Sequence, residues 1–212
     1  MITLYQRTDC PFCWKVRLAL AELGLGYNSV ETRLGEKHPD VQRLSPTGTV
    51  PVLVDGDVVV WESGVVLDYL DARYGAGSLL PTDPAQQAWV RSLHAYADKR
   101  IGPALRDLVF EKRSKLREEW DQSVIDSSET AWKECQAWLE ANIQPQWMSG
   151  CLLSAGECAL AARCGVAEAY GAAVTPEFPA LYEWFREVKW RPAWDAAYPE
   201  SFLAKDPELI TI

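Results

Sequence analysis

Two cysteines stand two residues apart in "RTDCPFCWKVRLALAEL", with a proline and an aromatic residue between them. Cys10 precedes Pro11, and proline suits the first turn of a helix because its missing N–H would have no partner there. The sulfur of Cys10 would then face free N–H groups and the positive end of the helix dipole, which can lower a thiol pKa from about 8.5 to roughly 3.5–7.5. Cys13, one turn further on, could attack a mixed disulfide formed at Cys10. The spacing therefore predicts a thiol-reactive or redox site.

Two other interpretations of the cysteine pair compete with this one. A structural zinc site needs four ligands, usually as two spaced pairs. The only other candidate nearby is His38, and no second C-x-x-C pair occurs, so we expect no metal. Both cysteines could instead be inert core residues, because buried cysteine behaves as a small hydrophobe. Their position at a helix start favours the thiol-reactive interpretation.

Composition limits the classes of partner. A net charge of -9 over 212 residues argues against direct binding of nucleic acid, which needs clustered Lys and Arg. No apolar run reaches the roughly 18 residues that span a bilayer, and the first residues lack the apolar core of a signal peptide. We therefore expect a cytoplasmic protein with no membrane contact. In that reducing compartment the other cysteines are expected to be core or surface thiols: Cys135, Cys151, Cys158 and Cys164.

The first third of the chain alternates strand-like and helix-like segments. The segment 11–23 predicts an amphipathic helix that ends at glycine. "VPVLVDGDVVVW" predicts two strands joined across Asp55 and Gly56, which is a strong hairpin signal. The remaining predicted elements are strands 2–5 and 27–32 and helices 38–44 and 63–75. The order is βαβαββα, which indicates a mixed four-stranded sheet with helices on its faces.

The pattern changes after "GAGSLLPTDP", a segment with the Gly, Ser and Pro content of a linker. From there on, only helical periodicity is found. The predicted helices are 85–116, 126–142, 157–170 and 179–189. The fold class is thus α/β plus all-α, with one domain at 1–77 and an all-helical domain at 84–212.

These features together resemble the cytosolic glutathione transferase family. The N-terminal arrangement is similar to the thioredoxin-like domain of those transferases and of glutaredoxins, and "CPFC" looks like the glutaredoxin active-site pattern. The small first domain, short linker and helical second domain are also the family's layout. The resemblance implies glutathione as co-substrate, no metal, and a homodimer. It adds Phe12, within the cysteine motif, to the glutathione-binding residues.

Two further segments carry the resemblance. "PTGTVPVLVDG" is similar to the family segment with a cis proline, which implies a cis Val50–Pro51 bond and a Val50 backbone free to pair with the cysteinyl part of glutathione. A trans proline at a strand start is the alternative. "WESGVVLDYL" resembles the motif that holds the γ-glutamyl end: Ser63, at a helix start, can bind the carboxylate, and Glu62 the ammonium.

Other residues have weaker signals. Lys37 lies where similar proteins offer a basic residue to the glycine carboxylate, although alone it would be read as a solvated lysine. In the helical domain the family builds an apolar pocket over the glutathione thiol, for which the loose candidates are His94, Tyr96, Arg100 and Ile101. Four tryptophans are expected to be packing residues: Trp132, Trp138, Trp184 and Trp194.

The sequence predicts that the family's capping box at the start of a buried helix is missing. The matching stretch "ECALAARC" places Ala159 and Ala162 at its two positions. Either Glu157 caps a slightly earlier start, or the start of this helix is less well fixed.

The function that these residues favour is a glutathione-dependent thiol transferase or disulfide reductase. Cys10 would attack a glutathione mixed disulfide and be released by a second glutathione, and Cys13 would be required only for a dithiol route. The enzymatic alternative is conjugation of glutathione to electrophiles, for which Tyr5 and Thr8 lie nearby without a clear role. The non-catalytic alternative is a partner-binding protein, because the segment 50–81 resembles stringent starvation protein A.

Overall fold

The computed structural model describes residues 1–142 and 153–203. Its first part is a four-stranded sheet in the order β2-β1-β3-β4. The strands are β1 (Ile2–Gln6), β2 (Tyr27–Glu31), β3 (Val52–Asp55) and β4 (Val58–Trp61). β1 runs parallel to β2 and antiparallel to β3, and the hairpin turns at Gly56, where φ is 60°. The predicted mixed sheet is confirmed.

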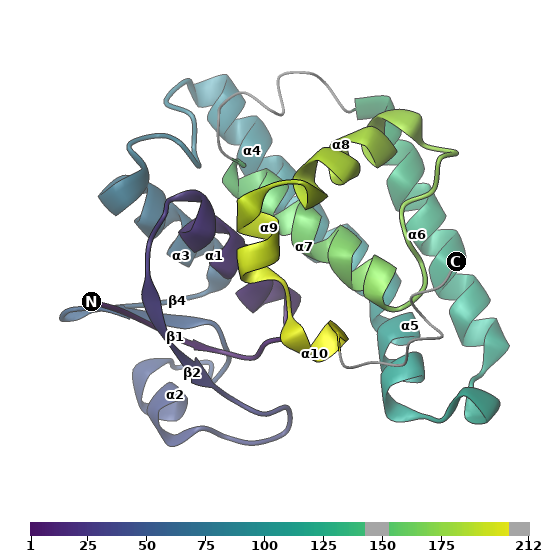
Figure 1. The fold of residues 1–212 in the computed structure, drawn as a ribbon, viewed down its shortest axis with the longest axis horizontal. Helices are drawn as coiled ribbons and strands as arrows, with labels where there is room; N and C mark the ends of the chain where they lie inside the picture. The colour runs from purple at the N-terminus through teal and green to yellow at the C-terminus, as the bar shows by residue number, and fades with distance from the viewer. Residues whose placement is uncertain (143–152, 204–212) are drawn as a thin grey trace.

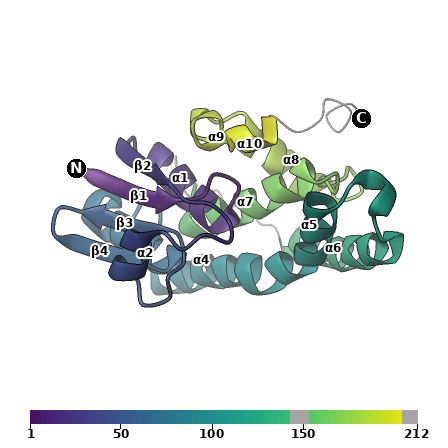
Figure 2. The same cartoon turned by 90° about the horizontal axis from the view of Figure 1, so that it is seen from below.

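Helix α1 (Pro11–Glu22) follows β1 and is buried on every side over residues 13–20. It packs against α3 (Ser63–Leu70), α7 (Ala155–Ala169) and α9 (Pro192–Ala197), and Figure 2 shows it between the sheet and the helical part. The predicted amphipathic helix is therefore wrong in one respect, since its charged residues face protein. Lys15 is 1% exposed and Arg17 4% exposed, because both reach buried polar partners.

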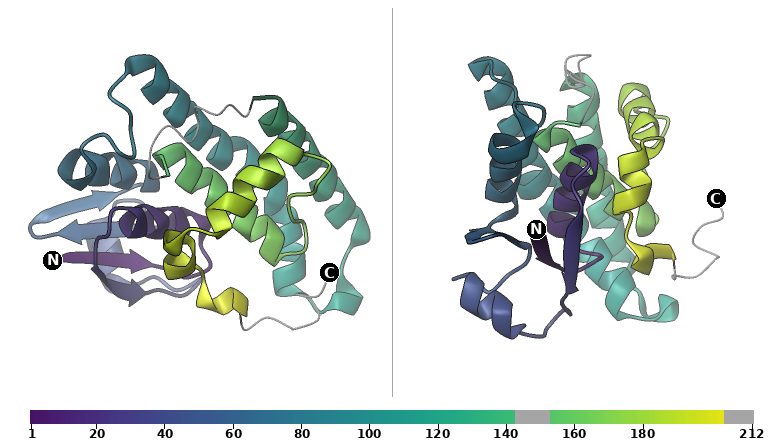
Figure 3. Two further views of the ribbon diagram at one scale, coloured as in Figure 1. Left: turned by 45° about the horizontal axis from the view of Figure 1, so that its top comes forward. Right: turned by 60° about the vertical axis from the view of Figure 1, so that its left-hand side comes forward.

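The second part is helical throughout its described residues, as predicted (Figures 1 and 3). Its elements are α4 (Pro84–Tyr96), a π-helical segment (Ala97–Ile101), α5 (Gly102–Ser114), a 3₁₀ turn (Arg117–Glu119), α6 (Gln122–Asn142), α7, α8 (Pro179–Lys189), α9 and α10 (Glu200–Leu203). The sheet part adds the short α2 (Pro39–Leu44) and a π-helical segment (Asp71–Gly75) after α3. Within the described residues, no helix is both long and apolar enough to cross a bilayer.

The long helix predicted at 85–116 is interrupted by the π-helical segment. Pro103 lies just past it and has no N–H to donate to the preceding turn, so the helical hydrogen bonding must change there. The segment places Asp98 against α1 and α7, since Asp98 binds Lys15 and Arg163. π-Helical turns often lie at functional sites.

Aromatic side chains fasten α1 to the C-terminal helices. The ring of Trp14 lies 4.9 Å from that of Trp194 and 5.4 Å from that of Tyr198, centroid to centroid. A Cβ atom on Gly165 of α7 would lie 2.2 Å from the Trp14 ring, so only glycine fits there. Of the four predicted packing tryptophans, Trp138 is 38% exposed and the others are buried.

The capping box of α7 is present, which corrects the prediction that it is missing. The helix begins at Ala155, and the Ser154 hydroxyl accepts from the Glu157 N–H (3.3 Å) while the Glu157 carboxylate accepts from the Ser154 N–H (2.9 Å). Ala159 and Ala162 are buried positions inside the helix. The box lies five residues earlier than the positions matched in the sequence analysis, and Glu157 is its third helical residue rather than its cap.

Ser154→Ala is expected to lower the free energy of unfolding by about 1–2 kcal/mol, because the Glu157 N–H loses its partner in a buried helix start. Urea denaturation followed by circular dichroism measures the change. Ser92→Ala, at an exposed position within α4, is the control and should change stability by less than about 0.5 kcal/mol. Equal effects of the two substitutions would contradict the role of the box.

Candidate active site

Cys10 is the residue that immediately precedes α1. Its carbonyl accepts hydrogen bonds from the N–H groups of Cys13 (3.0 Å) and Trp14 (2.8 Å), and its own N–H donates to the Arg7 carbonyl (3.1 Å). Pro11 is the first helical residue, as predicted. The sulfur of Cys10 therefore lies at the start of the helix, where unpaired N–H groups and the positive end of the dipole favour a thiolate.

The two cysteines have opposite acid–base properties. A hydrogen bond from the Cys13 thiol lowers the pKa of Cys10 to about 6 despite its burial, and the N–H groups of Cys13 and Phe12 and the charge of Arg7 act in the same direction. Burial raises the pKa of Cys13 well above its usual value, and the neighbouring Cys10 adds to this. At neutral pH Cys10 is thus a thiolate and Cys13 a neutral thiol that donates to it.

Arg7, three residues before Cys10, is a site residue that the sequence analysis missed. Its Nε lies 2.6 Å from the Asp9 carboxylate, and Arg113 of α5 binds the other oxygen of Asp9 at 2.6 Å. Asp9 therefore ties the loop before Cys10 to the helical part. The position of Arg7 in the same short loop as Cys10 was a signal that could have identified it.

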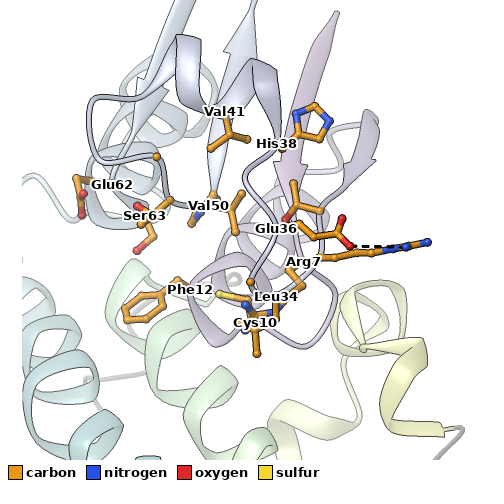
Figure 4. Close-up of a pocket in the computed structure, with 16 residues that line it drawn as sticks. Arg7, Cys10, Phe12, Leu34, Glu36, His38, Val41, Val50, Glu62 and Ser63 are labelled. Carbon is orange, nitrogen blue, oxygen red and sulfur yellow. Dashed lines mark ion pairs between the residues drawn. The ribbon is translucent and has the colours of Figure 1, made fainter.

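All the predicted glutathione-binding residues except Lys37 line one pocket of about 480 Å³. Figure 4 shows Glu62 and Ser63 on one side, Val50 and Cys10 in the middle, and Arg7 on the other side. Phe12 and Pro51 also line the pocket, whereas Lys37 does not line it and is exposed. Other lining residues that were not predicted include Arg33, Leu34, Glu36 and His38.

Two backbone features shape the pocket wall. The Val50–Pro51 bond is cis, as the resemblance implied. The Val50 N–H and C=O have no hydrogen-bond partner within the described part of the chain. Glu62 has a φ of 66°, a left-handed conformation that costs a non-glycine residue about 1–3 kcal/mol and is concentrated at ligand sites. Ser63 then begins α3, so its hydroxyl stands beside free helical N–H groups.

The candidates for an apolar pocket in the helical part do not form one. Ile101 is fully buried, Arg100 is exposed, and the ring of Tyr96 stacks on Trp138 at 4.1 Å. Only His94 lies near the site, where its Nε2 is 2.8 Å from the Lys15 Nζ. A Cβ atom on Gly64, next to Ser63, would lie 2.9 Å from the His94 ring, so this histidine packs against the start of α3.

Alkylation of Cys10 by iodoacetamide is expected to rise with pH through an inflection near 6 and to be nearly constant above about pH 7.5. The reason is that only the thiolate reacts and the pKa of Cys10 is about 6. Mass spectrometry of quenched samples measures the rate at this residue. A rate still rising at pH 9, as for an ordinary thiol with a pKa of about 8.5, would contradict the assignment.

Comparisons with known proteins agree with this geometry. Residues 4–78 match the family model described as "Glutathione S-transferase, N-terminal domain". Glutathione S-transferase GstB of Escherichia coli strain K12 is 33% identical over 202 residues, which cover 91% of this chain and 95% of that relative. A stringent starvation protein A homolog of Haemophilus influenzae is 37% identical over 105 residues, which cover 50% of each chain.

A solved structure supports the same assignment. The theta class glutathione S-transferase of the citrus canker pathogen Xanthomonas axonopodis pv. citri, with glutathione bound, matches at a TM-score of 0.80 and 28% identity, covering 92% of this chain and 96% of that chain. The sheet, the helical part and the pocket between Cys10 and Ser63 thus occur in a chain related to GstB along nearly its whole length. The chain belongs to the glutathione S-transferase family.

Proposed function

We propose that this transferase is a glutathione-dependent thiol transferase, or disulfide reductase, in which Cys10 is the nucleophile. The observation that carries the proposal is the pKa of Cys10, lowered to about 6 at the floor of the pocket by the hydrogen bond from Cys13. A thiolate at neutral pH is the reactive form for attack on a disulfide. Cys10 would form a mixed disulfide with glutathione, which a second glutathione thiolate then releases.

We propose that residues 1–77 form a domain that holds glutathione along the pocket and that residues 84–212 form the all-helical domain. The Ser63 hydroxyl and the start of α3 would bind the γ-glutamyl carboxylate, Glu62 the ammonium, and the Val50 backbone the cysteinyl part. The glycine carboxylate would lie at the other end, where Arg7, rather than the exposed Lys37, lines the pocket. The free Val50 backbone groups support this orientation.

Conjugation of glutathione to electrophiles fits the site less well, because the candidate hydroxyls are directed elsewhere. The Thr8 hydroxyl donates to Glu31 at 2.9 Å, and the Tyr5 ring packs against His38. Neither residue lines the pocket. The partial likeness to a stringent starvation protein A homolog supports a partner-binding role as the second candidate.

The experiment is turnover of a mixed disulfide between glutathione and mercaptoethanol by the purified protein with excess glutathione, coupled to glutathione reductase. Turnover above the uncatalysed rate supports thiol transfer. Binding of glutathione without turnover would contradict it and favour conjugation or partner binding.

We also propose a cytoplasmic homodimer. The cysteines of the described residues are free thiols, which suits a reducing compartment. Exposed apolar side chains lie on β4 and the start of α3, where Val59, Trp61 and Val65 are 39%, 38% and 54% exposed. Such a surface is typical of an interface, and sedimentation equilibrium tests the pairing.

A further inference from the structure

The ring of Phe12 lies against two buried cations. Phe12 is 38% exposed, next to Cys10 in the pocket wall. The Arg163 guanidinium carbon lies 4.6 Å from its ring centroid, and the Lys15 Nζ lies 5.1 Å from it. Arg163 comes from α7 and Lys15 from α1, so the contact joins the two parts of the chain beside the reactive sulfur.

The charges of this group are balanced only while Cys10 is a thiolate. Asp98 binds Lys15 at 2.6 Å and Arg163 at 3.1 Å and supplies the carboxylate of the group. His94 is the other titratable partner, and burial, together with Lys15, lowers its pKa to about 4, so it is neutral at pH 7. Lys15 and Arg163 against Asp98 leave one positive charge in excess, which the nearby Cys10 thiolate offsets until Cys10 becomes neutral in the mixed disulfide. Buried charge is stable when an anion pairs with it.

Some hydrogen-bond donors of the Arg163 guanidinium are unpaired. Its Nη2 donates to Asp98, whereas its Nε and Nη1 have no hydrogen-bond partner among the described residues. Neither nitrogen is sealed from solvent, although the residue as a whole is only 7% exposed. Arg163 does not itself line the pocket, but its guanidinium lies on the ring of Phe12, which does. A guanidinium fixed on an aromatic face with free N–H groups is suited to bind a carboxylate.

We propose that Arg163 is a specificity-determining residue that binds an acidic group on the departing half of the mixed disulfide. The inference rests on the proposed thiol transfer. In that reaction the Cys10 thiolate forms a bond to the glutathionyl sulfur, the bond from that sulfur to the departing sulfur breaks, and the departing sulfur leaves with the electron pair as a thiolate. A second glutathione thiolate then attacks the glutathionyl sulfur and releases the Cys10 thiolate and glutathione disulfide. The substrates favoured are acidic thiols joined to glutathione.

The test compares three mixed disulfides of glutathione, with 3-mercaptopropionate, mercaptoethanol and cysteamine, which carry an acidic, a neutral and a basic group. Each kcat/KM is divided by the uncatalysed rate with glutathione, which removes differences between the leaving thiols. The wild type should prefer the acidic over the neutral disulfide by roughly ten-fold and should disfavour the basic one. Equal values for the three would overturn the inference while leaving thiol transfer intact.

Variants assign the preference to Arg163. In Arg163→Gln the ratio of acidic to neutral values should fall to about one, and in Arg163→Lys a part of it should remain. Arg7→Gln removes the cation on the other side of Cys10, and loss of the preference there but not in Arg163→Gln would overturn the assignment. If circular dichroism shows that Arg163→Gln does not fold, the test uses the preference of the wild type among the three disulfides and its partial loss in Arg163→Lys.

A second measurement does not depend on turnover. Iodoacetate and iodoacetamide alkylate the same thiolate with release of iodide, but only iodoacetate carries a carboxylate. Relative to free glutathione, Cys10 should favour iodoacetate by several-fold, and Arg163→Gln should lose the preference. If no disulfide is turned over but this preference holds, the proposed reaction fails and the acid-binding site stands. If the wild type shows no preference for iodoacetate, the proposed acid-binding site at Arg163 is contradicted.

Discussion

Cys10→Ser is expected to abolish glutathione-dependent reduction of a mixed disulfide, by roughly three orders of magnitude or more. The serine hydroxyl has the shape of the thiol but is not ionised at neutral pH, so no nucleophile faces the glutathionyl sulfur. The coupled assay with glutathione reductase measures the loss. Glutathione binding should persist, since Ser63, Glu62 and Val50 are untouched, and calorimetric titration of the variant checks this. Activity that survives Cys10→Ser would contradict the assignment of the nucleophile.

Substitution of Cys13 distinguishes the monothiol route from the dithiol route in the same assay. Cys13→Ser keeps a hydroxyl that can donate to the Cys10 sulfur, and it should retain activity within a few-fold if the route is monothiol. Cys13→Ala removes the donor that contributes most to the low pKa of Cys10, so the inflection of the alkylation rate should move above 6. Loss of activity in Cys13→Ser as large as in Cys10→Ser would instead establish the dithiol route.

Asp98→Ala is expected to lower the free energy of unfolding by about 3–5 kcal/mol, the largest stability effect of any substitution considered. It removes the carboxylate that binds both Lys15 and Arg163, and these cations are 1% and 7% exposed. An unpaired charge in such a site is far more costly than a lost surface pair. Urea denaturation measures the change.

Asp107→Ala is the matched control, since Asp107 pairs with Arg106 on the surface, where the two side chains are 58% and 64% exposed. It should change the free energy of unfolding by less than about 1 kcal/mol.

The effect of Asp98 should also depend on pH. Burial alone would raise the pKa of Asp98, but Lys15 and Arg163 hold it below its usual value. The contribution of the Asp98 carboxylate to the free energy of unfolding is therefore fully present when the pH is above the unfolded-state pKa of about 3.9. It is lost as the pH falls through the lower pKa of the folded state. The difference in free energy of unfolding between wild type and Asp98→Ala should become smaller below about pH 4. A difference that does not change with pH would contradict the ionic origin of the Asp98 effect.

Features encoded by short stretches could be predicted from the sequence. Cys10 and Pro11 specify a helix start, and Asp55 with Gly56 specifies a hairpin, because each depends on neighbours in the chain. The cis bond at Val50 came from family resemblance, since the residues alone carry only a low base rate. The middle of the pocket and its Ser63 end were therefore predicted.

Features that depend on tertiary packing could not be predicted. Lys15 and Arg17 read as the polar face of a helix until α7 and α9 cover them, and their partners Asp98 and Ala197 lie far along the chain. The resemblance implied that Lys37 binds the glycine carboxylate of glutathione. In the loop between β2 and α2, however, Lys37 is exposed and does not line the pocket, whereas Arg7 does. The capping box was missed because the family pattern was matched at "ECALAARC" instead of at Ser154.

The burial of α1 also bears on whether the first part of the chain can be separated from the rest. A glutaredoxin is a free-standing domain, whereas here α1, which begins directly after Cys10, presents Trp14 and Arg17 to helices at the far end of the chain. Residues 1–77 cut from the rest would expose an indole and two charged side chains that the intact chain buries. Residues 1–77 are therefore not a transplantable module, because the helix that holds most of the "CPFC" motif shares its core with the helical part of the chain.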